Sequence, residues 1–265
     1  MLIAQLSDPH VCAPGTLYQG LVDSNAMFAA AVERLATLDP APDLVLLTGD
    51  VTEHAAADEY RLARQVLAGL RQPVLAIPGN HDEREAFRAA FGDLGYLPAT
   101  GPLHFVAGGH GPVRVIGLDI SVPGQHHGDF DAATAAWLEA ALASEPECPT
   151  LIMLHQPPVE TGIGFIDAYR CFNGERLAMV VARYPAVERV LCGHVHRHLS
   201  RRFGGSLLQI APSTTTAIAL RLAPGAEPAS FVEPPALLLH HWRAETGVTT
   251  HHVPIEPGIG PLRFF

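Results

Sequence analysis

Acidic, amide and imidazole side chains recur in this sequence directly after apolar runs that are typical of β-strands. They occur in the short motifs SDPH, LTGD, GNHD, LHQPP and GHVH, and the residues in them that could bind metal are Asp8, His10, Asp50, Asn80, His155, His194 and His196. If these strands share one sheet edge, their side chains converge, because ligand sites in α/β sheets lie beyond the carboxyl ends of the strands. The set contains enough ligands for two metal ions.

The residue types indicate which ions and which chemistry to expect. Carboxylate oxygens and neutral imidazoles suit divalent ions such as Fe, Mn, Zn or Co. Asp50 could give one oxygen to each of two ions and hold them about 3.5–4 Å apart, the separation that promotes displacement at phosphorus. A water shared by the ions would lose a proton readily, because the ions stabilise the hydroxide. These residues therefore predict a binuclear centre with a bridging hydroxide as nucleophile.

In this order, the motifs D-x-H, G-D, G-N-H-D, the single His of LHQPP and G-H-x-H resemble those of the calcineurin-like metallophosphoesterases. Within that family the sequence is most similar to the bacterial class III cyclic nucleotide phosphodiesterases and glycerophosphodiester phosphodiesterases. The resemblance runs from Met1 to roughly Gln209 and includes the stretches VPGQHHG and WLEAAL. Five motifs in a fixed order are specific, although G-D or H-x-H alone would be weak.

The resemblance implies a role for each motif residue. One ion would be held by Asp8, His10, Asp50 and His196, and the other by Asp50, Asn80, His155 and His194. His81 would face the phosphoryl group and assist departure of the alkoxide, while Asn80 would also contact the phosphoryl oxygens. Asp82 is expected to orient His81 or a ligand imidazole, as such carboxylates commonly do. Since the Asn80 amide carries no formal charge, we predict weaker metal binding at the second position.

Strand-like apolar runs alternate with helical patterns over most of the chain, which indicates an α/β fold. Strands are predicted at residues 2–6, 44–47, 74–77, 103–106, 114–118, 150–154, 187–191, 207–210, 236–242 and 248–253. Helices are predicted at residues 24–38, 56–70, 83–91, 132–143 and 174–184. From the resemblance we expect a four-layer α/β/β/α sandwich of two mixed β-sheets flanked by helices.

The length of 265 residues favours a single domain over residues 1–265. The part from 212 to 265 is less predictable. Its first segment, 212–235, is rich in Pro, Ala and Thr without a sustained period, and could cap the site or pack on a second subunit before a C-terminal hairpin. Phe264 and Phe265 could serve an interface or close the sheet. The resemblance adds the expectation of a homo-oligomer, a dimer or larger.

Composition excludes several partners and suggests a compartment. The formal charge of −10 lacks the basic footprint that binding to a nucleic-acid polymer requires. No apolar run approaches the roughly 18–20 residues that cross a bilayer, and a strand follows Met1 directly, so we expect neither a membrane protein nor a cleavable signal peptide. The cysteines form no C-x-x-C pair and are interpreted as reduced thiols in the cytoplasm; they are Cys12, Cys148, Cys171 and Cys192.

Differences from sibling families narrow the substrate. Serine/threonine protein phosphatases carry an Arg shortly after G-D and another just before G-N-H, where this chain has residues 51–54 (VTEH) and Pro78. Purple acid phosphatases place a Tyr ligand three residues after the same Asp, where this chain has Glu53. The arginine fork that suits a dianionic monoester is missing, so a monoanionic diester fits better.

The leading prediction is therefore a binuclear metal-dependent phosphodiesterase for small diesters, with 3′,5′-cyclic AMP as the first substrate to test. A glycerophosphodiesterase or a phosphonate monoester hydrolase of the same fold is the enzymatic alternative. A non-catalytic scaffold that keeps its metals is the alternative from another functional class.

Contacts to the organic part of the substrate are expected from the segment after His155. The candidates there are Asp167, Tyr169, Arg170, Phe172 and Asn173. Arg170 could pair with phosphate, although a surface salt bridge is equally compatible with its position. Of the two histidines in VPGQHHG, His127 is the candidate for contact with phosphate or a shared water, and His126 is expected to be an ordinary loop residue.

Overall fold

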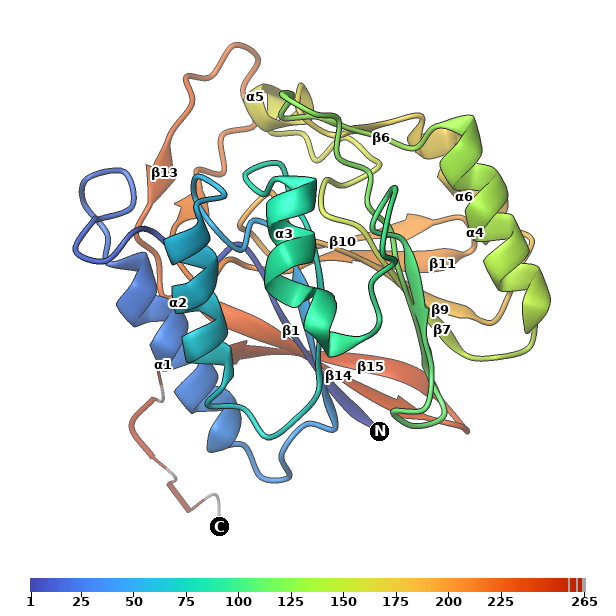
Figure 1. Cartoon of the computed structure of the whole chain (residues 1–265), viewed down its shortest axis with the longest axis horizontal. Coiled ribbons are helices and arrows are strands. Elements are labelled where there is room, and N and C mark those ends of the chain that lie inside the picture. Colours follow the sequence, from blue (N-terminus) through green and yellow to red (C-terminus); the bar gives the residue numbers. More distant parts are fainter. Residues whose placement is uncertain (257, 261, 264–265) are drawn as a thin grey trace.

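Two β-sheets lie face to face in this computed structural model, and helices cover the outer face of each sheet (Figure 1). Residues 1–256, 258–260 and 262–263 are described. Phe264 and Phe265, considered above for an interface, lie outside the described residues. None of the helices in the described part of the chain is both long and apolar enough to cross a membrane.

The first sheet has the strand order β15-β14-β1-β2-β3. Its strands are β1 (Leu2–Leu6), β2 (Leu44–Thr48), β3 (Val74–Ile77), β14 (Ala236–Arg243) and β15 (Gly247–Pro254). Strands β1, β2 and β3 are parallel, whereas β14 runs antiparallel to both β1 and β15. The C-terminal hairpin predicted from the sequence therefore forms the outer edge of this sheet.

The second sheet has the strand order β10-β11-β9-β7-β5-β4. Its strands are β4 (Phe105–Ala107), β5 (Arg114–Gly117), β7 (Thr150–Met153), β9 (Val187–Cys192), β10 (Leu199–Phe203) and β11 (Ser206–Ile210). The four inner strands are mutually parallel, and the edge strands β4 and β10 are antiparallel to their neighbours. Both sheets are therefore mixed.

Helices flank the sheets on their outer sides (Figure 1). Those beside the first sheet are α1 (Ser24–Ala36), α2 (Ala57–Leu67) and α3 (Arg84–Phe91), and those beside the second are α4 (Ala132–Ser144) and α6 (Gly174–Val181). Asp23 caps α1, because its carboxylate accepts a hydrogen bond from the backbone N–H of Ala26. Shorter turns are the helix α5 (Gly164–Asp167) and the 3₁₀ helix η1 (Gly92–Leu94).

The alternating direction of successive side chains along each strand explains how the layers pack. In β2, Leu44 and Leu46 pack in the core between the sheets, while Val45 and Leu47 pack in the core beneath the first helices. In β7, Leu151 packs between the sheets and Ile152 packs on the helix side of the second sheet. Successive side chains of a strand point to opposite faces, so apolar runs can bury both faces of each sheet. The predicted four-layer α/β/β/α sandwich is confirmed.

The predicted elements are present, with ends that shift by a few residues. The first helix stops at Ala36 instead of residue 38, because the N–H groups of Thr37 and Leu38 bond to carbonyls three residues back and break the α-helical pattern. Strand β10 was not predicted, since most of its side chains are exposed on the edge of the sheet and show no apolar alternation. Two small pairs were also missed: β6 (Gly128–Asp129) with β8 (Cys171–Phe172), and β12 (Ala217–Ile218) with β13 (Ser230–Phe231).

Candidate metal centre

The ligands predicted from the sequence lie together at one edge of the sandwich, where parallel strands of both sheets end. The strands and the residues that follow them are β1 with Asp8 and His10, β2 with Asp50, β3 with Asn80, β7 with His155, and β9 with His194 and His196. All of these except the half-buried Asn80 are buried. Buried carboxylates and imidazoles are costly unless partners or a metal compensate them.

Two groups of these side chains could each surround one cation. The first group comprises Asp8, His10, Asp50 and His196, the second comprises Asp50, His155 and His194, and one ligand atom per residue lies within 4.8 Å of the others in its group. Asp50 belongs to both groups. Its Oδ2 lies 3.1 Å from Nε2 of His155 and 3.7 Å from Nε2 of His10. One carboxylate therefore faces both groups, as a ligand shared by two ions would.

Three of the histidines are held through Nδ1 by acceptors. The pairs are His10 with a Glu53 carboxylate oxygen at 2.7 Å, His155 with the Thr48 carbonyl oxygen at 2.8 Å, and His196 with the Thr216 carbonyl oxygen at 3.0 Å. Each acceptor places the ring proton on Nδ1, so the lone pair on Nε2 is directed toward the centre. Nε2 of His10 and Nε2 of His196 are only 3.1 Å apart. Two lone pairs at that distance repel unless a proton or a cation lies between them.

The second group shows the need for a cation more directly. Within the described residues, Asn80 Oδ1 and His194 Nε2 are buried atoms without a hydrogen-bond partner, and the buried His155 Nε2 has only the Asp50 carboxylate nearby, at 3.1 Å. Leaving such atoms unsatisfied costs about 1–3 kcal/mol each, so native proteins rarely do so without a reason. A divalent ion that accepts these lone pairs would remove that cost. The residues therefore fit the metal that the sequence predicts.

The backbone at these positions is unusual. Asp8, His10, Asp50, His194 and His196 all have positive φ, between 44° and 70°. Residues other than glycine adopt this region seldom and at some cost, and such strain concentrates at functional sites. Strands β1, β2 and β9 are thus each followed by a turn that directs the ligands toward the centre.

Glycines make room for this convergence. A Cβ at Gly79 would overlap the Asp50 side chain, and a Cβ at Gly193 would overlap Ser7. The glycines that precede the ligands in G-N-H-D and G-H-V-H are therefore explained by the close approach of neighbouring segments of the same chain.

Electrostatic interactions keep the carboxylates of the centre ionised. Burial alone would raise the pKa of Asp8 and Asp50, but nearby imidazoles outweigh it and hold both pKa values below the usual range. Burial alone would lower the pKa of His155, yet Asp50 and Asp8 raise it to about 9. When no cation is bound, a proton on His155 therefore offsets part of the negative charge of Asp50 and Asp8. For His194, burial dominates and lowers the pKa to about 3, so its imidazole stays neutral.

His81 lies next to these groups and faces the cavity, with 28% of its side chain exposed. Its backbone N–H donates to Asp50 Oδ1 at 2.9 Å. Its Nδ1 lies 3.0 Å from the Glu53 carbonyl oxygen and 3.3 Å from the Glu53 carboxylate. Burial opposes protonation of His81, but the charges of Asp50 and Glu53 outweigh it and raise its pKa. The ring therefore holds a proton more readily than an ordinary imidazole.

Glu53 is the residue of this site that the sequence analysis did not identify. Its carboxylate contacts both His10 and His81, and with them it forms a third cluster of possible ligands. The only signal in the sequence was its place three residues after Asp50, where purple acid phosphatases carry a ligand.

Asp82 has a different role from the one expected. Its carboxylate accepts hydrogen bonds from the backbone N–H groups of Val51 and Gly79, at 3.0 and 2.9 Å, and from the hydroxyl of Tyr60 at 2.9 Å. Burial, with the charge of Asp50, raises its pKa to about 6. Asp82 therefore ties together the loops after β2 and β3, and the carboxylate next to Nδ1 of His10 and of His81 is that of Glu53.

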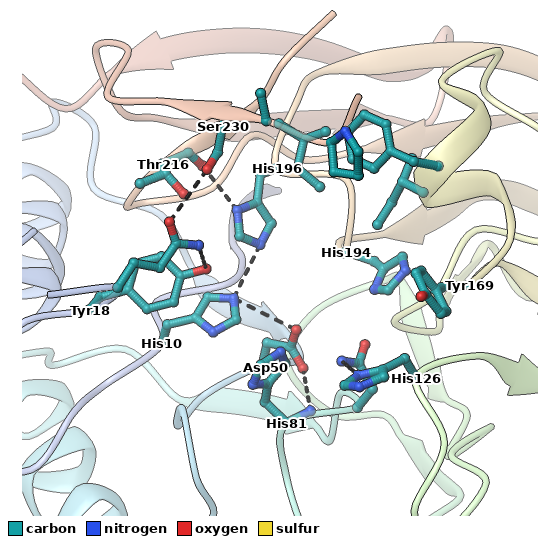
Figure 2. A pocket seen from close by; sticks show the side chains of 17 residues that line it. His10, Tyr18, Asp50, His81, His126, Tyr169, His194, His196, Thr216 and Ser230 are labelled. Carbon is teal, nitrogen blue, oxygen red and sulfur yellow. Dashed lines mark hydrogen bonds and ion pairs between the residues drawn. The ribbon is translucent and has the colours of Figure 1, made fainter. Parts of the chain in front are cut away.

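A cavity of about 450 Å³ lies over the centre, and all of the predicted ligands except Asp8 and His155 line it (Figure 2). Asp50, Asn80, His81, His194 and His196 are among its lining residues. No Lys or Arg is among the described residues that line it. The negative charge of a substrate would therefore be met by cations at the floor and by His81.

The two histidines of VPGQHHG are placed differently from the expectation. His126 lines the cavity, and its Nδ1 lies 3.4 Å from Nδ2 of Asn80. His127 instead packs against the ring of Phe172, with 4.7 Å between ring centroids. The loop was correctly predicted to approach the site, but the side chain nearest the centre is that of His126.

The segment 163–173 also approaches the cavity, but most of the substrate contacts predicted in it do not line the cavity. Phe165, Ile166 and Tyr169 line the cavity. The remaining candidates make local contacts: Asp167 with Thr161 and Gly162, Arg170 with the carbonyl of Asp167 and the ring of Phe172, and Asn173 with Asp129. Of the predicted substrate contacts in this segment, Tyr169 is the one at the cavity wall.

The motif order, the sandwich and the clustered ligands agree with a comparison of protein families. The model of the calcineurin-like phosphoesterase family matches residues 1–198. The chain belongs to this family. Its Asp and His clusters are accordingly a family metal site, able to bind metal ions.

Relatives within the calcineurin-like phosphoesterases support this membership over the whole chain. A probable glycerophosphodiester phosphodiesterase GpdQ of Arcobacter nitrofigilis is 34% identical, over 100% of this chain and 97% of that protein. The 3′,5′-cyclic adenosine monophosphate phosphodiesterase CpdA of Escherichia coli K12 is 31% identical, over 80% of this chain and 75% of that protein. A dimetal phosphatase from Danio rerio has the same fold, with a TM-score of 0.63, 14% identity, and coverage of 97% of this chain and 99% of that one.

Proposed function

We propose that this protein is a metal-dependent phosphodiesterase that hydrolyses small phosphodiesters with two divalent ions. One observation carries the proposal: Asn80 Oδ1 and His194 Nε2, buried and without a hydrogen-bond partner among the described residues, lie with the shared Asp50 on the floor of a cavity whose described lining contains no Lys or Arg. Proteins that bind dianionic monoesters commonly use arginine forks. A diester carries a single negative charge and fits this lining better.

The first ion is proposed to bind Asp8, His10, Asp50 and His196, and the second Asp50, Asn80, His155 and His194. These ligands suit Fe, Mn, Zn or Co. Bound there, the ions would polarise the phosphoryl group and lower the pKa of water at the centre.

The chain itself contributes orientation and a proton. Hydrolysis adds a water oxygen to phosphorus and breaks one ester P–O bond, and the departing alcohol must gain a proton. His81 faces the cavity beside Asp50, and its raised pKa favours the protonated ring. We propose that His81 donates this proton to the departing oxygen, while the half-buried Asn80 side chain helps to orient the phosphoryl oxygens.

Two substrate classes are candidates, and relatives bear the name of each. 3′,5′-Cyclic AMP is the substrate proposed first, and a relative named for that activity is 31% identical over 80% of the chain. Glycerophosphodiesters are the second candidate, because relatives named for that activity extend over 100% and 95% of the chain. Phosphonate monoesters are a third class for comparison.

The proposal is tested by removing and restoring metal. Chelator-treated protein should not hydrolyse bis(p-nitrophenyl) phosphate, and Mn, Co, Zn or Fe should restore turnover. p-Nitrophenyl phosphate, a monoester with the same leaving group, should be the poorer substrate in kcat/KM. Equal turnover with and without chelator would refute the metal-dependent reaction. Tight metal binding without turnover of any ester would instead favour the non-catalytic scaffold.

We further propose a homo-oligomer in the cytoplasm. Four apolar side chains of the segment around β12 and β13 are more than half exposed: Leu220, Leu222, Phe231 and Val232. A second copy of the chain that covers them would remove this apolar surface from water. The four cysteines are free, as expected for reduced thiols. Analytical ultracentrifugation tests the proposed association, and a monomer at micromolar concentration would contradict it.

A further inference from the structure

The cavity over the metal centre has two chemically different sides. Figure 2 shows Tyr18, Thr216 and Ser230 on the side of His10 and His196, whereas Tyr169 lies on the side of His194. With Gln19, the first three form an uncharged polar wall, here called the polar wall. The opposite side is mostly apolar, because the side chains of Phe165 and Ile166 line the cavity together with Tyr169.

Side chains of the polar wall form a directed chain of hydrogen bonds. The Ser230 hydroxyl donates to Oε1 of Gln19 at 3.4 Å, and Nε2 of Gln19 donates to the Tyr18 hydroxyl oxygen at 3.1 Å. Tyr18 accepts in this chain, so its own O–H proton remains available to a ligand. Burial raises the pKa of Tyr18, which keeps that proton in place. The Tyr18 ring is fixed by stacking on His10, with 4.7 Å between centroids.

Thr216 adds an unsatisfied hydroxyl to the same wall. The residue is only 4% exposed, lines the cavity, and its Oγ1 has no hydrogen-bond partner among the described residues. Its carbonyl oxygen accepts the Nδ1 proton of His196, which anchors the residue beside the metal centre. A buried hydroxyl without a partner is costly, so its place on a cavity wall indicates that a ligand completes it.

We infer that the polar wall binds a neutral, hydroxyl-bearing substituent of the substrate, and that Thr216 and Gln19 determine this preference. The inference rests on the proposed phosphodiesterase function. A hydroxyl group both donates and accepts, so it can bond to the free O–H groups of Tyr18 and Thr216 and to the oxygens of Gln19 and Ser230. A second anionic group is disfavoured, because no cationic side chain among the described lining residues would offset its desolvation.

The opposite, apolar side of the cavity suits the second substituent of the diester. A diester has two substituents, and the two sides flank the centre from different directions. The arrangement therefore suits an unsymmetrical diester, with a polyol or similar group on the polar wall and an aromatic or alkyl group against Phe165 and Tyr169. Of the two candidate substrate classes, it favours glycerophosphodiesters over cyclic AMP, whose two ester oxygens belong to one sugar.

The test compares two diesters that differ only in their hydroxyl groups. 2,3-Dihydroxypropyl p-nitrophenyl phosphate and propyl p-nitrophenyl phosphate share a leaving group and a chain length. With the full chain loaded with Mn, we expect kcat/KM to favour the dihydroxypropyl ester by about tenfold, the effect of one or two neutral hydrogen bonds. Thr216→Val removes the hydroxyl at nearly constant shape and should reduce this ratio several-fold. Gln19→Leu should also reduce it, and because Gln19 has a positive φ of 51°, thermal denaturation of this variant checks that it is folded.

Thr214→Val is the matched control. Thr214 is a buried threonine two residues away whose Oγ1 also lacks a partner among the described residues, but it does not line the cavity. This variant should keep the wild-type ratio. A wild-type ratio near one, or a ratio unchanged in both Thr216→Val and Gln19→Leu, would overturn the inference while leaving the phosphodiesterase function intact. No release of p-nitrophenol from either ester by the wild type would overturn both.

Discussion

Nδ1 of His10 lies 2.7 Å from a carboxylate oxygen of Glu53, and the same carboxylate oxygen is 3.3 Å from Nδ1 of His81. Glu53 thus connects a proposed metal ligand to the proposed proton donor. It fixes the His10 proton on Nδ1 and leaves Nε2 for the cation, which is the usual effect of a carboxylate behind a ligand imidazole.

Replacing Glu53 should therefore weaken the first metal position. Glu53→Leu removes the acceptor and should lower metal affinity there by about 10–100-fold, the usual range for loss of such a partner. Glu53→Gln keeps an acceptor oxygen and should retain more of the affinity. Titration of the metal-free protein with Mn by calorimetry measures this directly. If Glu53→Leu binds Mn as tightly as the wild type, the orienting role is wrong.

His81 should matter most for poor leaving groups. His81→Ala removes the proposed acid and should slow hydrolysis of diesters with alkyl leaving groups by about 10²–10⁴-fold. p-Nitrophenolate needs little protonation, so turnover of bis(p-nitrophenyl) phosphate should fall much less. Metal content, measured by atomic emission, should remain near the wild-type value. An equal loss with both kinds of leaving group would contradict proton donation by His81.

Asn80 should make the second metal position bind its ion less tightly than the first. Its amide oxygen is buried without a partner in the described part of the chain and carries no formal charge. Asn80→Asp adds a charge at the same position and should strengthen binding of the second ion, whereas Asn80→Ala should weaken it. Competition with a chelator of known affinity ranks the three proteins. If the two variants shift the affinity in the same direction, Asn80 is not a ligand.

A histidine away from the centre should make stability depend on pH. His240 is fully buried between Gln5 and Thr250, and burial lowers its pKa to about 3, below the usual 6.5. As the pH falls below 6.5, His240 of the unfolded chain therefore binds a proton, whereas His240 of the folded chain stays neutral. The stability that neutral His240 provides is complete above that pH and is lost progressively as the pH falls from 6.5 toward 3.

The size of this effect can be measured against a variant. Between pH 7 and pH 5, the free energy of unfolding of the wild type should fall by about 2 kcal/mol more than that of His240→Gln. Urea denaturation at both pH values gives the two differences. Parallel pH dependence of the wild type and the variant would show that His240 does not titrate as described.

Much of the site could be predicted from the sequence, because strand ends carry strong signals. An apolar run followed by Gly and Asp, as at Gly49 and Asp50, marks both the strand and the ligand. The parallel order of the strands then brings distant ligands such as Asp8 and His194 to one edge, where the His194 N–H bonds to the Asp8 carboxylate at 3.0 Å.

Side-chain direction in loops could not be predicted in the same way. His126 and His127 are adjacent, and no period in a loop indicates which of them faces the cavity. Glu53 contacts His10 across 43 residues of sequence, and Asp82 contacts Val51 across 31. These pairings depend on the exact turn after each strand, where positive φ values rotate the side chains away from the alternation of the strand.

Two cations are proposed to lie on either side of the Asp50 carboxylate. Anomalous diffraction from crystals of the full chain soaked in Mn tests it most directly. We predict two peaks about 3.5–4 Å apart, one bounded by Asp8, His10 and His196, and the other by Asn80, His155 and His194. A single peak, or peaks remote from Asp50, would contradict the account.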